Sequence, residues 1–82
     1  MKEYRVIVSN KTLWCPLRVI APSQREAEWM VEKLLRSPEW EAQEEEMIKS
    51  GMDEYRARYH IKSIKERGDA TGQEPGVTIV QL

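Results

Sequence analysis

The sequence predicts a small α+β domain with the element order ββααββ, in which one or two helices pack on one face of a four-stranded, mainly antiparallel sheet. Length is the first observation, because 82 residues suffice for one sheet and one or two helices around a small core. Periodicity is the second: apolar residues alternate in strand fashion toward both ends and recur at helical spacing between them. With 40% hydrophobic and 33% charged residues, the composition is typical of a folded chain. We therefore expect a single domain over residues 1–82.

A hairpin is expected first. Residues 2–8 alternate between two faces, and the alternation resumes over residues 13–21 after the turn residues Ser9-Asn10-Lys11. Pro16 interrupts the second strand, and because proline cannot donate a ladder hydrogen bond, it predicts an edge position or a bulge there.

Two helices follow. Ser23 and Glu26 form a capping box that begins the first helix, since each side chain can satisfy a free backbone amide. The apolar stripe of this helix consists of Ala27, Met30, Val31, Leu34 and Leu35. Ser37 is expected to cap the second helix, with Pro38 at its first position, and Gly51 is expected to end it.

Two more strands complete the sheet. From Tyr55 the period returns to two, which predicts a third strand with one basic face. That face consists of Arg56, Arg58, His60 and Lys62. Continued helix over residues 52–60 is the competing interpretation. Residues 68–76 contain three glycines and predict a loop, and residues 77–82 predict a short final strand.

Charge is sorted along the chain. Residues 38–54 carry seven acidic side chains and one lysine, whereas residues 55–67 carry five basic side chains and one glutamate. The net charge of −1 therefore hides a dipolar molecule whose two sides suit different partners.

The residues offer no catalytic or metal-binding constellation. Cys15 and His60 are the only nucleophile and base of the usual kind, and Cys15 falls on the inward face of a strand as a structural thiol. His60 lies among arginines without neighbouring metal ligands, and the glutamates of residues 44–46 fan around a helix. We expect no enzyme activity, no metal and no cofactor.

Residues 4–36 resemble the small DpnD/PcfM-type proteins found on phages and mobile elements. The resemblance lies in the strand Leu17-Arg18-Val19-Ile20-Ala21, the break Pro22-Ser23 and the helix start Arg25-Glu26-Ala27-Glu28. It implies an accessory protein of mobile genetic elements without known catalytic residues. It transfers no binding site.

Protein–protein interaction through the acidic second helix is the leading functional hypothesis. The expected contact residues are Trp29, Trp40, Glu41, Glu44 and Glu45. Exposed tryptophans are typical of interfaces, and a helix dense in glutamate can occupy a basic groove as a polyanion mimic. Alternatively, the two tryptophans pack on each other or cap the core.

Nucleic-acid binding is the alternative. The basic strand face of Arg56, Arg58, His60 and Lys62 is the candidate surface. Arg5, Arg18 and Trp14 of the hairpin would extend it into a face of cations interleaved with an aromatic ring. A pI of 5.9 argues against a dedicated nucleic-acid domain, and open sheets ordinarily carry charges on the solvated face.

The sequence also gives expectations for cellular location and for self-association. No apolar stretch approaches the 20 or so residues that cross a bilayer, and the N-terminus lacks a secretory signal. A single cysteine agrees with a reducing compartment, so we expect a cytoplasmic protein without membrane contact. An open edge at Pro16 or at residues 77–82 would allow homo-oligomers.

Overall fold

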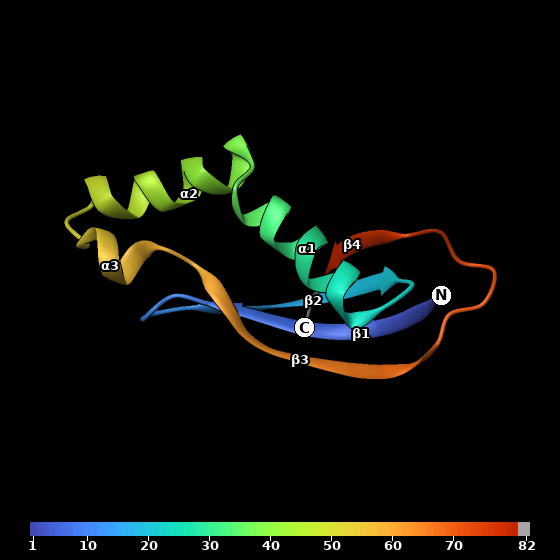
Figure 1. Ribbon diagram of the computed structural model, residues 1–82. Helices are drawn as coiled ribbons and strands as arrows, with labels where there is room; N and C mark the ends of the chain where they lie inside the picture. The colour runs from blue at the N-terminus through green and yellow to red at the C-terminus, as the bar shows by residue number, and fades with distance from the viewer. Residues whose placement is uncertain (81–82) are drawn as a thin grey trace.

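The computed structural model describes residues 1–80, and it confirms the α+β class and the ββααββ order with one additional helical turn. The elements are β1 (Lys2–Ser9), β2 (Trp14–Ala21), α1 (Gln24–Leu35), α2 (Pro38–Lys49), α3 (Glu54–Ala57), β3 (His60–Asp69) and β4 (Gly76–Ile79). The strand order is β3-β1-β2-β4, and every neighbouring pair is antiparallel. Figure 1 shows α1 and α2 on one side of this sheet.

The core lies between α1 and one face of the sheet. Alternate residues of β1 and β2 are buried there: Tyr4, Val6, Val8, Leu17, Val19 and Ala21. Ala27 and Val31 of α1 and Trp40 of α2 complete this cluster. Burial of one such aliphatic side chain stabilises the fold by roughly 1.5–3 kcal/mol. Residues of the opposite parity, such as Arg5, therefore point to the face that α1 leaves uncovered.

The serine caps and the glycine stop predicted for the two long helices are present, but within residues 1–80 the Glu26 side chain forms no return hydrogen bond to the Ser23 N–H, so the capping box is only half formed. Ser23 Oγ accepts a hydrogen bond from the Glu26 N–H at 3.2 Å, and Ser37 Oγ accepts one from the Trp40 N–H at 3.4 Å. Gly51 follows α2 with a φ of 105°, a left-handed conformation that favours glycine. In Figure 1, α2 extends past the hairpin end of the sheet, with α3 below it.

The third strand begins at His60, so the prediction of a strand from Tyr55 is wrong. The competing helical interpretation holds for Glu54–Ala57. Asp53 explains this turn, because its carboxylate accepts a hydrogen bond from the Arg56 N–H at 3.1 Å and so caps α3.

Asn10 anchors the hairpin turn to α3. Its Oδ1 accepts hydrogen bonds from the N–H groups of Thr12 and Leu13 at 2.8 and 2.6 Å. Its Nδ2 donates to the Ala57 carbonyl at 3.2 Å. This buried side chain thus links two segments that are remote in sequence.

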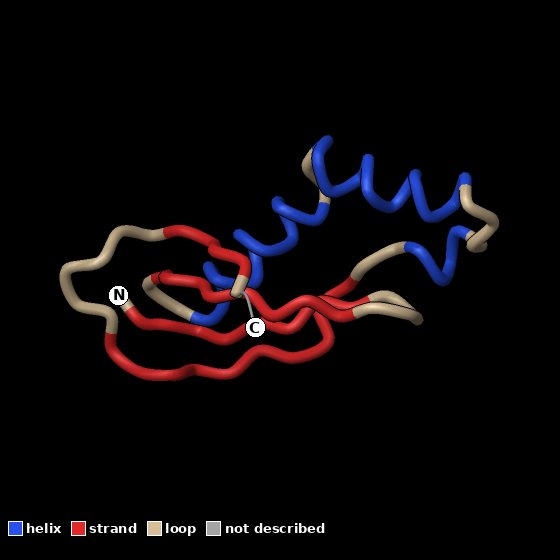
Figure 2. The backbone as a smooth tube through the Cα atoms, turned by 180° about the vertical axis from the view of Figure 1, so that it is seen from behind, coloured by secondary structure: helices blue, strands red, loops and turns tan. Residues whose placement is uncertain are grey.

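Both ends of the β3–β4 connection differ from the sequence expectation. β3 continues through Gly68, which still pairs with Glu3 of β1, so the loop is confined to residues 70–75. Figure 2 shows this loop bowing out at the end of the sheet where the N-terminus lies. β4 begins at Gly76, and the predicted final strand extends to residues 81–82, which lie outside the described residues.

Pro16 marks the point where the ladder between β2 and β4 ends. The first paired residue of β2 in that ladder is Leu17, and the Pro16 carbonyl accepts a hydrogen bond from the Val80 N–H at 3.0 Å. Because proline has no backbone N–H, Pro16 cannot donate a hydrogen bond to β4 in return. Within residues 1–80, the start of β2 at Trp14 is therefore an edge on this side, as the proline predicted.

Candidate nucleic-acid interface

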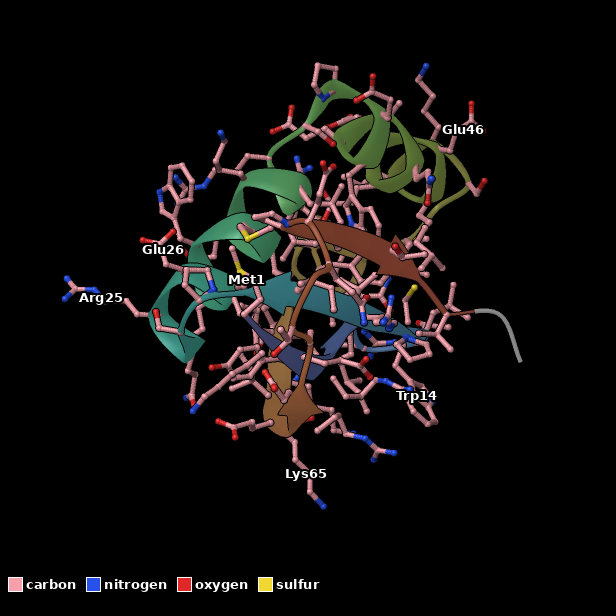
Figure 3. All side chains as sticks on the ribbon, turned by 90° about the vertical axis from the view of Figure 1, so that its right-hand side faces the viewer. Met1, Trp14, Arg25, Glu26, Glu46 and Lys65 are labelled. Carbon is pink, nitrogen blue, oxygen red and sulfur yellow. The ribbon has the colours of Figure 1, made fainter. Side chains whose placement is uncertain are left out.

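The side of the sheet opposite α1 forms the candidate site, called here the open face. Cross-strand pairing places its residues side by side: Glu3, Arg5, Ile7, Trp14, Pro16, Arg18, Ser63 and Lys65, with Lys62 in the bulge of β3 beside Ile7. Figure 3 shows Trp14 on the side of the sheet away from α1, and Lys65 extending beyond β3. Among residues 1–80, no helix packs on this face.

Three cations stand in one row across the open face. Arg5 of β1 pairs directly with Arg18 of β2 and with Lys65 of β3. Neighbouring strands lie about 4.8 Å apart, so this cation row spans roughly 10 Å between its outer backbones. Like charges opposite each other on a sheet destabilise it, so the row concentrates positive potential at a cost to the fold.

Only one member of the cation row has an acidic partner within the described part of the chain. Arg18 Nε lies 3.0 Å from Glu3 Oε1, and Arg18 Nη2 donates to Gln73 Oε1 at 2.7 Å. Arg5 and Lys65 form no ion pair with residues 1–80. The Nε of Arg5 is enclosed by the protein without a hydrogen-bond acceptor.

An exposed aromatic ring lies at the hairpin end of the same face. Trp14 is 62% exposed, and the Nζ of Lys62 lies 6.0 Å from its ring centroid. Ser9 of β1 pairs with both Trp14 and His60, so His60 belongs to the same end of the sheet. The open face therefore combines unpaired cations with one tryptophan.

The predicted basic strand face is only partly assembled. Lys62 and His60 lie on β3, whereas Arg56 lies on α3, where its Nε is 3.6 Å from Asp53 Oδ2. Arg58 precedes β3 and is held by three carboxylates. They belong to Glu44, Glu45 and Glu54, at 3.1, 3.1 and 3.3 Å, and their hydrogen bonds raise the pKa of the Arg58 guanidinium. Arg58 therefore links α2 and α3 through ion pairs and is not a free cation for a ligand.

The predicted acidic contact surface loses two of its members to the interior. Trp40 is 6% exposed and Glu44 is 3% exposed. The prediction that these two side chains lie at the surface, where a partner could contact them, is therefore wrong. The two residues are one turn apart on α2 and share the side that faces the rest of the fold. Trp40 packs edge-on against Tyr59, with ring centroids 5.3 Å apart.

The other predicted contact residues remain at the surface but do not form one patch. Glu41 and Glu45 are exposed on α2, and Glu45 is bound by Arg58. Trp29 is 56% exposed on α1, where the Nζ of Lys33 lies 4.5 Å from its ring centroid. The two tryptophans therefore have separate partners and do not pack on each other.

Cys15, the metal-ligating side chains and the lengths of the helices bear on catalysis, metal binding and membrane insertion. Cys15 packs against the core, and burial raises the pKa of its thiol. Within residues 1–80, no three metal-ligating side chains gather, and no helix combines the length and apolar character needed to span a bilayer.

Comparison with known proteins gives no match, whether with family models, with curated proteins or with solved structures. The resemblance of residues 4–36 to DpnD/PcfM-type proteins stays a prediction from the sequence.

Proposed function

We propose that this protein is a small non-catalytic module that binds nucleic acid, with the phosphate backbone lying across the cation row of the open face. The observation that carries the proposal is the register that aligns Arg18, Arg5 and Lys65, two of which have no acidic partner among residues 1–80. Lysine and arginine side chains that neutralise phosphates supply most of the affinity for nucleic acid. The resemblance to proteins of phages and mobile elements supports such a setting.

The acidic composition of the chain is compatible with this role, because the negative charge gathers elsewhere. Glu39, Glu41 and Glu46 are exposed on α2, and Figure 3 shows Glu46 and Lys65 on opposite sides of the molecule in this view. Charges separated by more than about 10 Å are largely screened at moderate salt. A phosphate chain on the open face therefore meets mainly the local cations.

Charge reversal tests the proposal. We expect Lys65→Glu to weaken binding of a fluorescein-labelled oligonucleotide at least about tenfold, measured by fluorescence anisotropy at low salt. Arg25→Glu is the matched control, because it changes the net charge equally on α1, away from the open face (Figure 3). Equal losses in the two variants, or no loss in either, would refute the assignment of the open face.

A protein partner for α2 is the second candidate function. A groove of about 590 Å³ runs beside α2 and is lined by Met47, Met52 and Glu46. Exposed Glu39, seven residues before Glu46, lies on the same side of α2, whereas Glu41 lines a separate groove with Glu45. A basic segment with an apolar anchor fits such a surface by charge complementarity.

Affinity capture with the wild type and with an E39K/E41K/E46K variant tests this second function. A basic partner that binds only the wild type supports it. Capture of the same proteins by both would remove the acidic face of α2 from consideration.

A further inference from the structure

We infer that the open face selects single-stranded nucleic acid, with one base stacked on Trp14 and the adjoining backbone on the cation row. This inference rests on the proposed function and specifies its ligand. Four features carry it: the exposed ring, its distance from the cations, the unpaired Arg5 side chain, and the width of the sheet.

The Trp14 ring is largely open to solvent, with one cation over it. It is 62% exposed at the first position of β2, and the Lys62 ammonium lies 6.0 Å from the ring centroid. By contrast, Trp40 packs on Tyr59 and is buried. An exposed indole beside a cation suits a nucleobase, whose face stacks on the ring while its phosphate meets the charge.

The ring and the cation row are spaced for one continuous strand. Trp14 and Arg18 are four residues apart on β2, and a strand rises about 3.3 Å per residue, so the two lie roughly 13 Å apart. Ile7 and Pro16 fill the interval between them on the open face. A few nucleotides can bridge this separation across an apolar floor.

Arg5 at the centre of the row needs an acceptor that the protein does not supply. Its side chain forms no hydrogen bond within residues 1–80, and its Nε is enclosed without a partner. The Nε is closed to solvent and therefore to a ligand, but Nη1 and Nη2 have no partner within residues 1–80, so a phosphate above the row can accept hydrogen bonds from these terminal nitrogens. This gives the centre of the face a ligand preference as well as a charge.

The same geometry disfavours a duplex. Four strands at about 4.8 Å spacing give a sheet roughly 14 Å wide, whereas the major groove admits a helix or a two-stranded ribbon. Bases inside a duplex are also stacked on one another and cannot reach Trp14. A single strand, whose bases can splay out, uses both the ring and the cation row.

The test compares Trp14→Leu with Trp29→Leu, which removes a similarly exposed indole from α1, 56% against 62%. We expect a labelled oligothymidylate to bind the wild type about tenfold more tightly than a duplex of equal length, by anisotropy at low salt. Trp14→Leu should weaken oligothymidylate binding about tenfold and leave duplex binding unchanged, whereas Trp29→Leu should change neither. Oligothymidylate should quench the tryptophan fluorescence of Trp29→Leu but not that of Trp14→Leu.

The outcomes separate this inference from the proposed function. If Trp14→Leu binds oligothymidylate as the wild type does while Lys65→Glu does not, stacking is refuted and the phosphate site stands. If the wild type binds neither oligothymidylate nor duplex, both are refuted. An abasic oligomer that binds as tightly as oligothymidylate would also refute stacking. Equal urea midpoints for the two leucine variants confirm that folding does not account for the difference.

Discussion

Replacement of Glu44 by alanine is expected to weaken the fold more than any other change to a glutamate of α2. This carboxylate is 3% exposed and joins α2 to the start of β3. Its Oε2 accepts a hydrogen bond from the Tyr59 N–H at 2.7 Å, and its Oε1 accepts one from Arg58 Nη1 at 3.1 Å. The variant leaves the Tyr59 N–H without a partner, while Arg58 keeps Glu45 and Glu54.

The size of the loss follows from these contacts. A partly buried N–H left without an acceptor costs about 1–3 kcal/mol, and removal of the buried side-chain carbons adds to it. We therefore expect Glu44→Ala to lower the free energy of unfolding by about 3 kcal/mol. Glu44→Gln keeps the size of the side chain and one acceptor for the Tyr59 N–H. It should therefore lower the free energy of unfolding by only about 1 kcal/mol.

Urea unfolding followed by tryptophan fluorescence measures both values. A small domain loses about 1 kcal/mol of stability per molar urea, so Glu44→Ala should shift the midpoint downward by about 3 M. Glu41→Ala, an exposed position on the same helix, is the control and should stay within about 0.5 kcal/mol of the wild type. Coincident curves for Glu44→Ala and Glu41→Ala would refute the role of the buried carboxylate.

Two further predictions concern titrating groups. The Thr71 hydroxyl donates to Asp69 at 2.6 Å and holds the pKa of that carboxyl below its ordinary value of 3.8, so Asp69 stabilises the fold at neutral pH and loses this effect as the pH falls through its lowered pKa. Thr71→Val should raise the pKa of Asp69 in an NMR titration, and an unchanged pKa would contradict the assigned cause. Burial raises the pKa of the Cys15 thiol, so iodoacetamide should alkylate it more slowly at pH 8 in the native protein than in urea. Equal rates in the two states would show that the thiol is not protected.

Features that depend on local sequence were predictable. Ser23, Ser37 and Gly51 bound the two long helices because capping and left-handed glycine conformations need only neighbouring residues. The prediction at Tyr55 failed because a two-residue period over a short stretch also fits a single helical turn. Asp53, a good N-cap directly before that stretch, was the signal for the helix.

The burial of two α2 residues can be predicted only in part from the sequence. Trp40 and Glu44 are four residues apart, so helical spacing places them on one face, and the apolar partner indicates which face is buried. A buried glutamate nevertheless requires a partner, and Arg58 comes from a segment fourteen residues away. Nothing in the local sequence identifies that pairing.

The composition of the open face depends on strand register, which the alternation within one strand does not reveal. Arg5, Arg18 and Trp14 are expected near a basic strand, but Lys65 pairs with Arg5 in the stretch of β1 between two register shifts in its pairing with β3. A shift of one residue would have turned Lys65 to the other face. The cation row is therefore a property of the assembled sheet.

The most direct test of the proposed function is the salt dependence of oligothymidylate binding by the wild-type protein. The cation row contributes about three phosphate contacts, so a plot of log binding constant against log salt concentration should fall with a slope of about −2. A slope near this value that flattens in Lys65→Glu would support phosphate binding on the open face. Binding that is insensitive to salt, or no binding at low salt, would contradict it.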